Sequence, residues 1–198
     1  MPKTVFVDVD TQLDFLYPAG ALYVPGAERI VPAIERLNGY AASRGIPVLS
    51  TTDAHTENDP EFHEWPPHCV AGTIGQHKPS QTLLEKRVVV SNRDTTIALN
   101  GAQQIILEKQ TIDAFATRSL RHVLEALDAG TFVVYGVVTE ICVRHMARGL
   151  LAAGKSVVVV ADAVRALSEE KASLALEEIQ SLGGTVSTVG EVVTEPRP

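Results

Sequence analysis

The stretch that decides the fold of this chain is FVVYGVVTEICVR, residues 132–144. Its first half is a continuous apolar run rich in valine, which is typical of a strand buried on both faces of a sheet. Its second half predicts a helix from Thr139, with Cys142 about three residues inside it. A thiol at a helix N-terminus lies near unpaired N–H groups and the positive end of the helix dipole, which favour the nucleophilic thiolate. The alternative is a small buried apolar side chain, so further residues must decide between the two.

The same alternation of short apolar runs and amphipathic stretches continues along the whole chain. Strands interleaved with helices predict an α/β domain of three layers, in which a mainly parallel sheet carries helices on both faces. We expect one domain spanning residues 1–198. Glycines follow the amphipathic stretches, where a left-handed residue commonly ends a helix, at Gly45, Gly130, Gly154 and Gly183. The predicted strands span residues 4–9, 46–51, 104–107, 131–137, 156–161 and 185–189, and the predicted helices span residues 27–43, 117–129, 139–153 and 168–182.

The composition is that of a globular protein, with 45% hydrophobic and 21% charged residues. A net charge of −7 without a basic run argues against nucleic-acid and anionic-membrane partners. The apolar runs are too short to span a bilayer, and the N-terminus passes into a strand pattern without the features of a signal peptide. With only two cysteines there is no disulfide framework, so we expect a cytoplasmic protein.

Polar residues end several of the predicted strands, where ligands bind in open α/β sheets. The strand ends are marked by Asp10, Asp53, Lys109 and Asp162, and one strand runs into Cys142. A carboxylate such as Asp10 can take the proton of a thiol and return it to a leaving amine, while an ammonium such as Lys109 lowers the pKa of a thiol. The structural alternatives are a turn or helix cap for Asp10 and a solvated charge for Lys109. Asp8, two residues earlier on the same side of the strand, is a weaker candidate for the base.

Residues 53–103 break the alternating rhythm, and an excursion of this length is usually functional. The segment opens with Asp53 and His55 at a strand end, and further possible metal ligands follow at Glu61, His63 and His68. One carboxylate with two or three imidazoles suits one divalent ion such as Zn²⁺, Fe²⁺ or Mn²⁺. The alternative is an ordinary polar loop surface.

Taken together and in this order, the motifs resemble those of the isochorismatase-like cysteine hydrolases, and within that family those of the nicotinamidases. The matching segments cover roughly residues 5–165 and are Asp10-x-Gln12-x-Asp14-Phe15, Asp53-x-His55, Trp65-Pro66-Pro67-His68-Cys69-Val70-x-Gly72-Thr73, Lys109 with Asp113-Ala114-Phe115, the stretch from Gly136 to Val143, and Asp162-Ala163. The ordered set is specific, although any one of these segments alone would be weak.

This resemblance implies a Rossmann-like domain with a catalytic triad of Asp10, Lys109 and Cys142. It also implies a cis peptide bond between Val138 and Thr139, and an oxyanion hole formed by the backbone N–H groups of Val138 and Cys142. A small-molecule amide is the implied substrate, and a homo-oligomer is the expected assembly.

The resemblance further implies one divalent ion, held by Asp53, His55 and His68. The fourth ligand varies among nicotinamidases; here Glu61 falls at the expected place, and His63 and Glu64 compete with it. The aromatic walls of the substrate pocket are expected at Phe15, Trp65 and Phe115, with core packing as the alternative for Phe15.

Two departures from the family pattern concern the substrate more than the chemistry. The connection from His68 to Lys109 is long and contains residues 87–92 and Asn100-Gly101; we expect it to form an extra strand pair or a lid that alters the pocket. Ile141 replaces a polar residue often seen just before the cysteine. His145, three residues after Cys142, points down the predicted helix and is interpreted as structural.

The sequence therefore predicts a metal-dependent cysteine amidase that hydrolyses nicotinamide to nicotinate and ammonia. One alternative is a cysteine hydrolase of the same fold acting on another small amide or ureide. A second is a non-catalytic ligand-binding homologue, which the intact set of Asp10, Lys109 and Cys142 disfavours. A third is an ether hydrolase of the isochorismatase type, which the cysteine and the metal residues disfavour.

Overall fold

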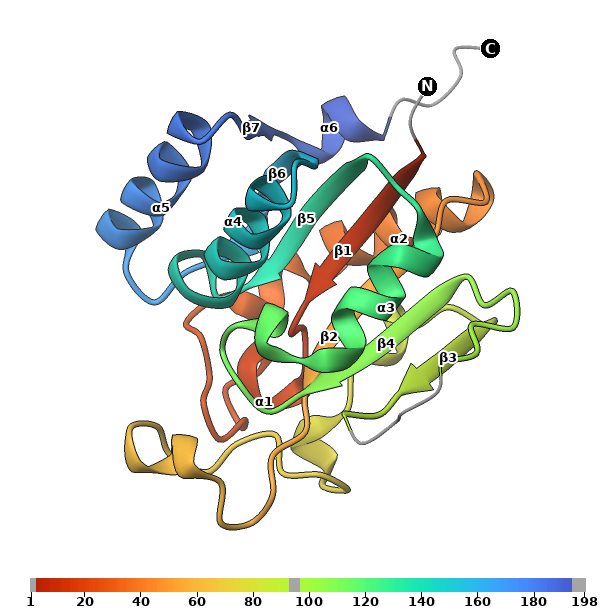
Figure 1. Cartoon of the computed structure of the whole chain (residues 1–198). Coiled ribbons are helices and arrows are strands. Elements are labelled where there is room, and N and C mark those ends of the chain that lie inside the picture. The colour runs from red at the N-terminus through yellow and green to blue at the C-terminus, as the bar shows by residue number, and fades with distance from the viewer. Residues whose placement is uncertain (1–2, 93–96, 194–198) are drawn as a thin grey trace.

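The computed structural model describes residues 3–92 and 97–193. Its centre is a sheet of seven parallel strands in the order β3-β4-β2-β1-β5-β6-β7 (Figure 1). The parallel α/β class expected from the valine-rich runs is therefore confirmed. The strands are β1 (Thr4–Val9), β2 (Val48–Asp53), β3 (Arg87–Val90), β4 (Gln104–Lys109), β5 (Thr131–Val137), β6 (Ser156–Arg165) and β7 (Thr185–Ser187).

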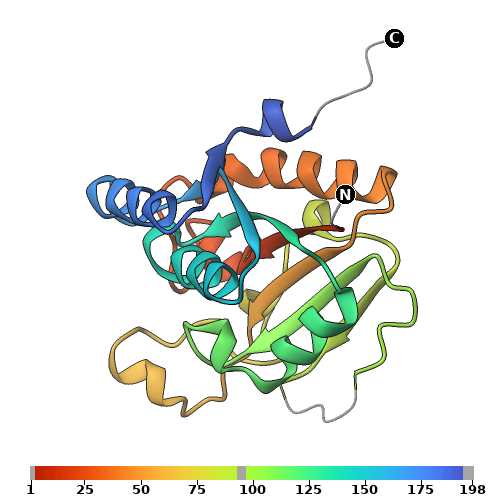
Figure 2. The ribbon, with the colours of Figure 1, turned by 45° about the horizontal axis from the view of Figure 1, so that its top comes forward.

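Helices cover both faces of this sheet and complete the three layers. The core on one face contains side chains from α3, α4 and α5, and the core on the other face contains side chains from α2 and α6. Figure 2 shows α2 on one side of the strands and α3 and α4 on the other. The helices are α1 (Leu13–Leu16), α2 (Val31–Ser43), α3 (Arg118–Leu127), α4 (Arg144–Ala152), α5 (Glu169–Ser181) and α6 (Val189–Val192).

Strand β1 shows why the sheet needs apolar side chains on both faces. Val5, Val7 and Val9 point into the core beneath α3 and α4, while Phe6 points into the core beneath α2. Because successive side chains of a strand alternate between the faces, Asp8 lies on the α2 face with Phe6. Its carboxylate contacts Asn38 of α2 and Ser50 of β2 there.

The elements differ from the sequence-based prediction mainly at their ends. Residues 27–30 form a 3₁₀ turn before α2, whose first turn contains Pro32, a residue without an N–H group to leave unsatisfied. Strand β6 continues to Arg165, four residues further than expected from the apolar run, because pairing with β5 resumes after a bulge. Gly45, Gly154 and Gly183 have the expected left-handed φ, but Asp128 takes that position after α3 in place of Gly130.

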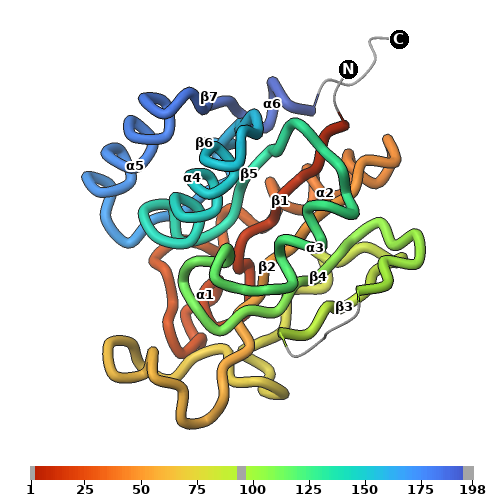
Figure 3. Tube along the Cα trace, viewed as in Figure 1, coloured from red at the N-terminus to blue at the C-terminus, as the bar shows by residue number. Residues whose placement is uncertain are grey.

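The long connection after β2 lies beyond the carboxyl ends of the central strands (Figure 3). It contains 3₁₀ turns at Pro60–His63, Ile74–Gln76 and Ser80–Thr82 before it enters β3. Instead of the expected strand pair or lid, residues 87–90 form one edge strand that pairs with β4. The segment before it packs beneath α2, because Asn38 donates a hydrogen bond of 2.8 Å to the carbonyl of Thr82.

Candidate active site and metal centre

Asp10 lies at the carboxyl end of β1 and is enclosed by protein. Its backbone N–H donates to the carbonyl of Thr51 at 3.1 Å, and the hydroxyl of Thr51 donates to its Oδ1 at 2.7 Å. Its φ of 50° is left-handed, which aspartate tolerates better than most residues, and turns the chain off the sheet edge. Asp10 is therefore held at the backbone and at the carboxylate.

Lys109 ends β4 directly beside Asp53, because these two residues are partners in the parallel pairing of β2 and β4. Its ammonium lies 2.5 Å from Asp53 and 2.9 Å from Asp10. Burial lowers the pKa of Lys109, but the carboxylates of Asp10 and Asp53 outweigh it and raise this pKa well above its usual value. Lys109 is thus a permanently charged, buried bridge between two acids and not a solvated strand end.

Cys142 lies in a π-helical turn, Thr139–Val143, directly before α4. Burial raises the pKa of its thiol well above the usual value, and the carboxylates of Asp10 and Asp53 add to that rise. Lys109 lowers this pKa but only partly offsets the other effects. Lys109 thus acts on the thiol in the expected direction, while burial and the two carboxylates act against it, and the contact with Asp10 supplies a base for the thiol.

The backbone between β5 and this turn contains a cis peptide bond, which joins Val137 to Val138. It lies one residue earlier than expected, at the point where β5 ends and before the turn that starts at Thr139. Val138 and Cys142 both line the pocket described below. Their role as oxyanion donors stays a prediction.

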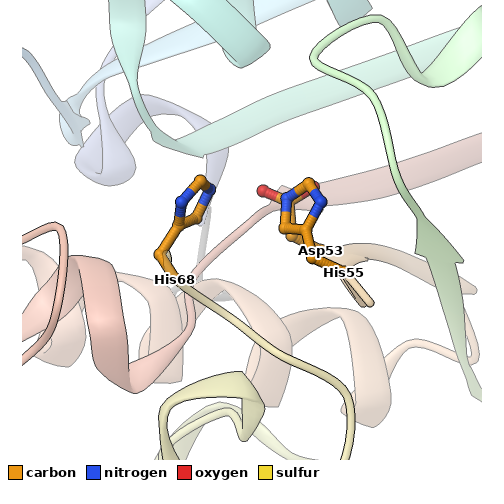
Figure 4. Close-up of side chains that lie close together, drawn as sticks. All are labelled: Asp53, His55 and His68. Carbon is orange, nitrogen blue, oxygen red and sulfur yellow. The ribbon is translucent and has the colours of Figure 1, made fainter. Parts of the chain in front are cut away.

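Three possible metal ligands converge beside this group of residues. The ligand atoms of Asp53, His55 and His68 all lie within 4.8 Å of one another, and all three residues are buried (Figure 4). A parallel β-bridge between His55 and Val70 brings the segment with His68 alongside the end of β2. Burial lowers the pKa of His68, which favours the neutral imidazole that binds metals.

The geometry of the two imidazoles fits a divalent ion. Nδ1 of His55 lies 3.1 Å from Asp59, and Nδ1 of His68 lies 2.8 Å from the carbonyl of Pro66. These acceptors leave the Nε2 atoms for a ligand, which is the usual arrangement around metal-binding histidines. Both ring nitrogens of His55 are buried without a hydrogen-bond partner within residues 3–92 and 97–193, and Nδ1 is the one that faces Asp59.

Among the candidates for the fourth ligand, Glu61 is the one that faces the cluster. Its carboxylate lies 3.9 Å from Nε2 of His68, whereas His63 and Glu64 are exposed. Burial and the charge of Asp53 raise the pKa of Glu61. A cation at the site would lower the pKa of Glu61 and so offset both effects.

One pocket connects the cysteine with the metal cluster. Its fourteen lining residues combine Cys142 and four possible proton or metal ligands with an apolar wall; they are Asp10, Phe15, Leu22, Val24, Asp53, Glu61, Trp65, His68, Ile112, Val137, Val138, Ile141, Cys142 and Leu167. The expected walls Phe15 and Trp65 are in place. Phe115 instead packs against Gly149 of α4, and Ile112 from the same loop lines the pocket.

A comparison with known protein families matches the isochorismatase domain to residues 4–191. The chain belongs to this family. The match begins at the first residue of β1 and ends within α6, so all of the strands and both groups of possible ligands lie inside it.

Individual members of the family that resemble the chain have names of amide-hydrolysing enzymes. The nicotinamidase/pyrazinamidase of Mycobacterium tuberculosis is 29% identical over 181 residues, covering 87% of this chain and 92% of that one. The N-carbamoylsarcosine amidase of Arthrobacter is 24% identical over 152 residues, or 77% of this chain; the match spans 55% of that longer protein. The crystal structure of the pyrazinamidase of Pyrococcus horikoshii in complex with zinc has a TM-score of 0.81 and 29% identity, covering 94% of this chain and 99% of that one.

Gln12 is a residue of the site that sequence reasoning quoted only as part of a motif. Its carboxamide accepts a hydrogen bond from the N–H of Asp53 at 2.7 Å and donates to the carbonyl of Asp53 at 2.8 Å. It also donates to the carbonyl of Gln76 at 2.8 Å. Gln12 therefore joins the end of β1 to the metal cluster, and its place two residues after Asp10 was the only signal of that role.

Two other residues noted in the sequence lie away from the pocket. Asp162 is inside β6 and accepts a hydrogen bond from the N–H of Val189, at the start of α6, at 2.7 Å. His145 lines a separate surface hollow with Asp113 and Arg148. In the part of the chain that the structure covers, no helix has both the length and the apolar character needed to cross a membrane.

Proposed function

We propose that this protein is a metal-dependent cysteine amidase that hydrolyses nicotinamide to nicotinate and ammonia. The observation that carries the proposal is that Cys142 and Asp10 line the same pocket as Asp53, His68 and Glu61, which belong to or face a cluster suited to a divalent ion. Lys109 lies behind this lining, with its ammonium 2.9 Å from Asp10. Its relatives named as nicotinamidase and amidase support the same reaction class. A non-catalytic binding protein would have no use for the thiol and its base.

Asp10 would act twice as a proton carrier. As the sulfur of Cys142 forms a bond to the carboxamide carbon, Asp10 takes the thiol proton. The carbonyl oxygen becomes an oxyanion that the N–H groups of Val138 and Cys142 would stabilise, by about 3–4 kcal/mol per donor. The C–N bond then breaks, and the amine leaves as ammonia with the proton from Asp10.

Hydrolysis of the thioester would complete the cycle. Asp10 takes a proton from water while the water oxygen attacks the acyl carbon, and the C–S bond breaks to release the carboxylic acid. The proton held by Asp10 returns to the sulfur. Lys109 stays charged and keeps the carboxylate of Asp10 in place through this sequence.

Asp53, His55 and His68, with Glu61, would hold the ion. When bound, the ion would offer a ligand position to the ring nitrogen of the substrate and so orient the ring. Zn²⁺, Fe²⁺ and Mn²⁺ all accept this set of ligands. The residues of the chain itself, in particular Phe15 and Trp65, would then enclose the ring.

The pocket offers no cationic side chain to a ureide that bears a carboxylate. Its fourteen lining residues include three carboxylates, Asp10, Asp53 and Glu61, and neither arginine nor lysine. Lys109 is 1% exposed and is already shared by two acids. The bound ion would offset the charges of Asp53 and Glu61, so among the groups that line the pocket it alone could receive a substrate carboxylate.

The test is release of ammonia by the metal-loaded protein from nicotinamide, pyrazinamide, benzamide and N-carbamoylsarcosine. We expect nicotinamide to exceed benzamide in kcat/KM by about tenfold or more, because benzamide lacks the ring nitrogen. The difference should shrink in His55→Ala, and Cys142→Ala should be inactive. Faster hydrolysis of benzamide or N-carbamoylsarcosine would refute the substrate, and full activity of Cys142→Ala would refute the mechanism.

Two broader expectations are also part of this proposal. We propose that the protein acts in the cytoplasm and that it self-associates. Size-exclusion chromatography with light scattering would test the second, and a monomer at micromolar concentration would contradict it.

A further inference from the structure

A second group of buried polar side chains lies on the α2 face of the sheet, outside the pocket. At its centre is Asp8, which has no exposed surface. Nδ2 of Asn38 and Oγ of Ser50 each lie 3.3 Å from its Oδ2. Asp8 therefore faces α2 and β2, and is not placed to act as the base for Cys142.

The counter-ion of Asp8 comes from a distant part of the chain. Nζ of Lys78 lies 2.9 Å from Oδ2 of Asp8 and also donates a hydrogen bond to the hydroxyl of Thr11. The same hydroxyl donates to Oδ1 of Asp8 at 2.7 Å. We refer to Asp8, Thr11 and Lys78 as the Lys78 clamp. All three residues are buried, and no step of the proposed hydrolysis uses them.

The Lys78 clamp is joined to the proposed base through the turn at the end of β1. Asp10 adopts its left-handed φ at the start of this turn, and its carbonyl accepts the N–H of Gln12 at 2.8 Å. A left-handed residue other than glycine persists only where its surroundings hold it. The side chain of Thr11 folds back to Asp8 and so closes the turn directly after Asp10.

The other end of the Lys78 clamp is anchored in the segment that follows the metal ligands. The N–H of Leu13 donates to the carbonyl of His77 at 2.8 Å, and Gln12 donates to the carbonyl of Gln76 at the same distance. Lys78 thus continues a set of contacts that fastens residues 76–78 to residues 11–13. An ion pair enclosed in this way constrains geometry more than it adds stability, because desolvation offsets much of the attraction.

We propose that Thr11 and Lys78 are positioning residues that hold Asp10 at the distance from Cys142 required for proton transfer. This inference rests on the proposed role of Asp10 as the base. It assigns the buried pair of Asp8 and Lys78 to the reaction, although neither side chain reaches the pocket.

The first test compares Thr11→Val with Thr11→Ser in the metal-loaded enzyme. Valine keeps the volume of threonine and leaves Asp8 paired with Lys78, but it removes the hydroxyl, whereas serine keeps the hydroxyl. We expect kcat of Thr11→Val to fall about 10- to 100-fold with little change in KM, because a small misplacement of a catalytic group has an effect of this size. Thr11→Ser should retain most of the activity.

Thr82→Val is the matched control. Thr82 is an equally buried threonine of the same face, but its hydroxyl donates to the carbonyl of Pro79 and not to the Lys78 clamp. Its kcat should stay near that of the parent. Parental kcat in Thr11→Val, or an equal loss in Thr82→Val, would overturn the proposal.

A double variant, Asp8→Asn with Lys78→Met, tests the lysine itself. It removes the ion pair without leaving a single buried charge, so its Tm should stay closer to that of the parent than the Tm of Lys78→Met alone. We expect its kcat to remain about tenfold below that of the parent. Recovery of both Tm and kcat would show that Lys78 only neutralises Asp8, which would overturn its positioning role. This variant also decides the question if Thr11→Val does not fold.

A measurement without substrate separates this inference from the proposed function. The rate at which iodoacetamide alkylates Cys142 depends on how Asp10 contacts the thiol, whichever amide is the substrate. In Thr11→Val this rate should move from the parental value toward that of Asp10→Asn, with unchanged metal content. A parental rate would overturn the inference even if nicotinamide is hydrolysed, and inactivity of the parent toward nicotinamide would refute the proposed function alone.

Discussion

The carboxylate of Asp59 lies 3.1 Å from Nδ1 of His55, and both side chains are buried. The same carboxylate accepts the N–H of Glu61 at 3.0 Å, so it links the orientation of one proposed metal ligand to the backbone of another. The fit of this cluster to an ion therefore depends on a residue that would not itself bind it.

Replacement of Asp59 should weaken metal binding without removing a ligand. In Asp59→Asn a single acceptor oxygen must serve both His55 and the N–H of Glu61, so one of the two contacts is lost. We expect the affinity for Zn²⁺ to fall about 10- to 100-fold. Competition with a chromophoric chelator would measure it. Glu57→Gln, an exposed acid of the same loop, should bind as the parent does, and an equal loss there would contradict the specific role of Asp59.

The fourth metal ligand can be tested with neighbouring glutamates. Glu61→Gln should reduce the affinity for the ion, because it removes a charge 3.9 Å from His68. Glu64→Gln, on the exposed side of the same turn, should leave it unchanged. Isothermal titration of the metal-free proteins would compare the two. A larger effect of Glu64→Gln would move the fourth ligand to that residue.

Asp10→Asn should affect turnover and thiol acidity in opposite directions. Turnover should be lost, because the base is gone. The pKa of Cys142 should fall, because the charge of Asp10 and its hydrogen bond with the thiol both raise this pKa in the parent. The charge of Lys109, which lowers the pKa, is kept in the variant. The thiolate should therefore appear at a lower pH than in the parent. Absorbance at the thiolate band during a pH titration, in a Cys69→Ala background with equal metal loading, would show it; a higher pKa would refute this electrostatic account.

Lys109→Met should destabilise the metal-free fold strongly. The change leaves Asp10 and Asp53 buried without their shared counter-ion, for which we expect a loss of about 3–5 kcal/mol in the free energy of unfolding at neutral pH. Urea denaturation would measure the loss. Lys155→Met removes a lysine whose Nζ donates to the carbonyl of Ala129, and should cost only about 1 kcal/mol. Similar losses in the two variants would mean that the charge of Lys109 is not needed for stability.

The sequence by itself determined the layers of the fold and most residues of the edge where the pocket lies. Apolar runs rich in valine are typical of strands in a covered parallel sheet, so β1, β5 and β6 were recognisable from the order of the residues alone. Parallel strands place their carboxyl ends at one edge, so Asp10 and Lys109 could be assigned to the same neighbourhood before the structure was known.

Only the tertiary structure decided which distant residues meet and in which direction burial shifts their pKa values. The β-bridge at His55 brings His68 beside it, Ile112 takes the place expected for Phe115, and burial raises the pKa of Cys142 despite Lys109. Lys78 reaches Thr11 across 67 residues of the chain, along a connection without periodicity. Periodicity reports which face of an element is buried, whereas contacts between loops, and the desolvation that sets a pKa, depend on the packing of the whole domain.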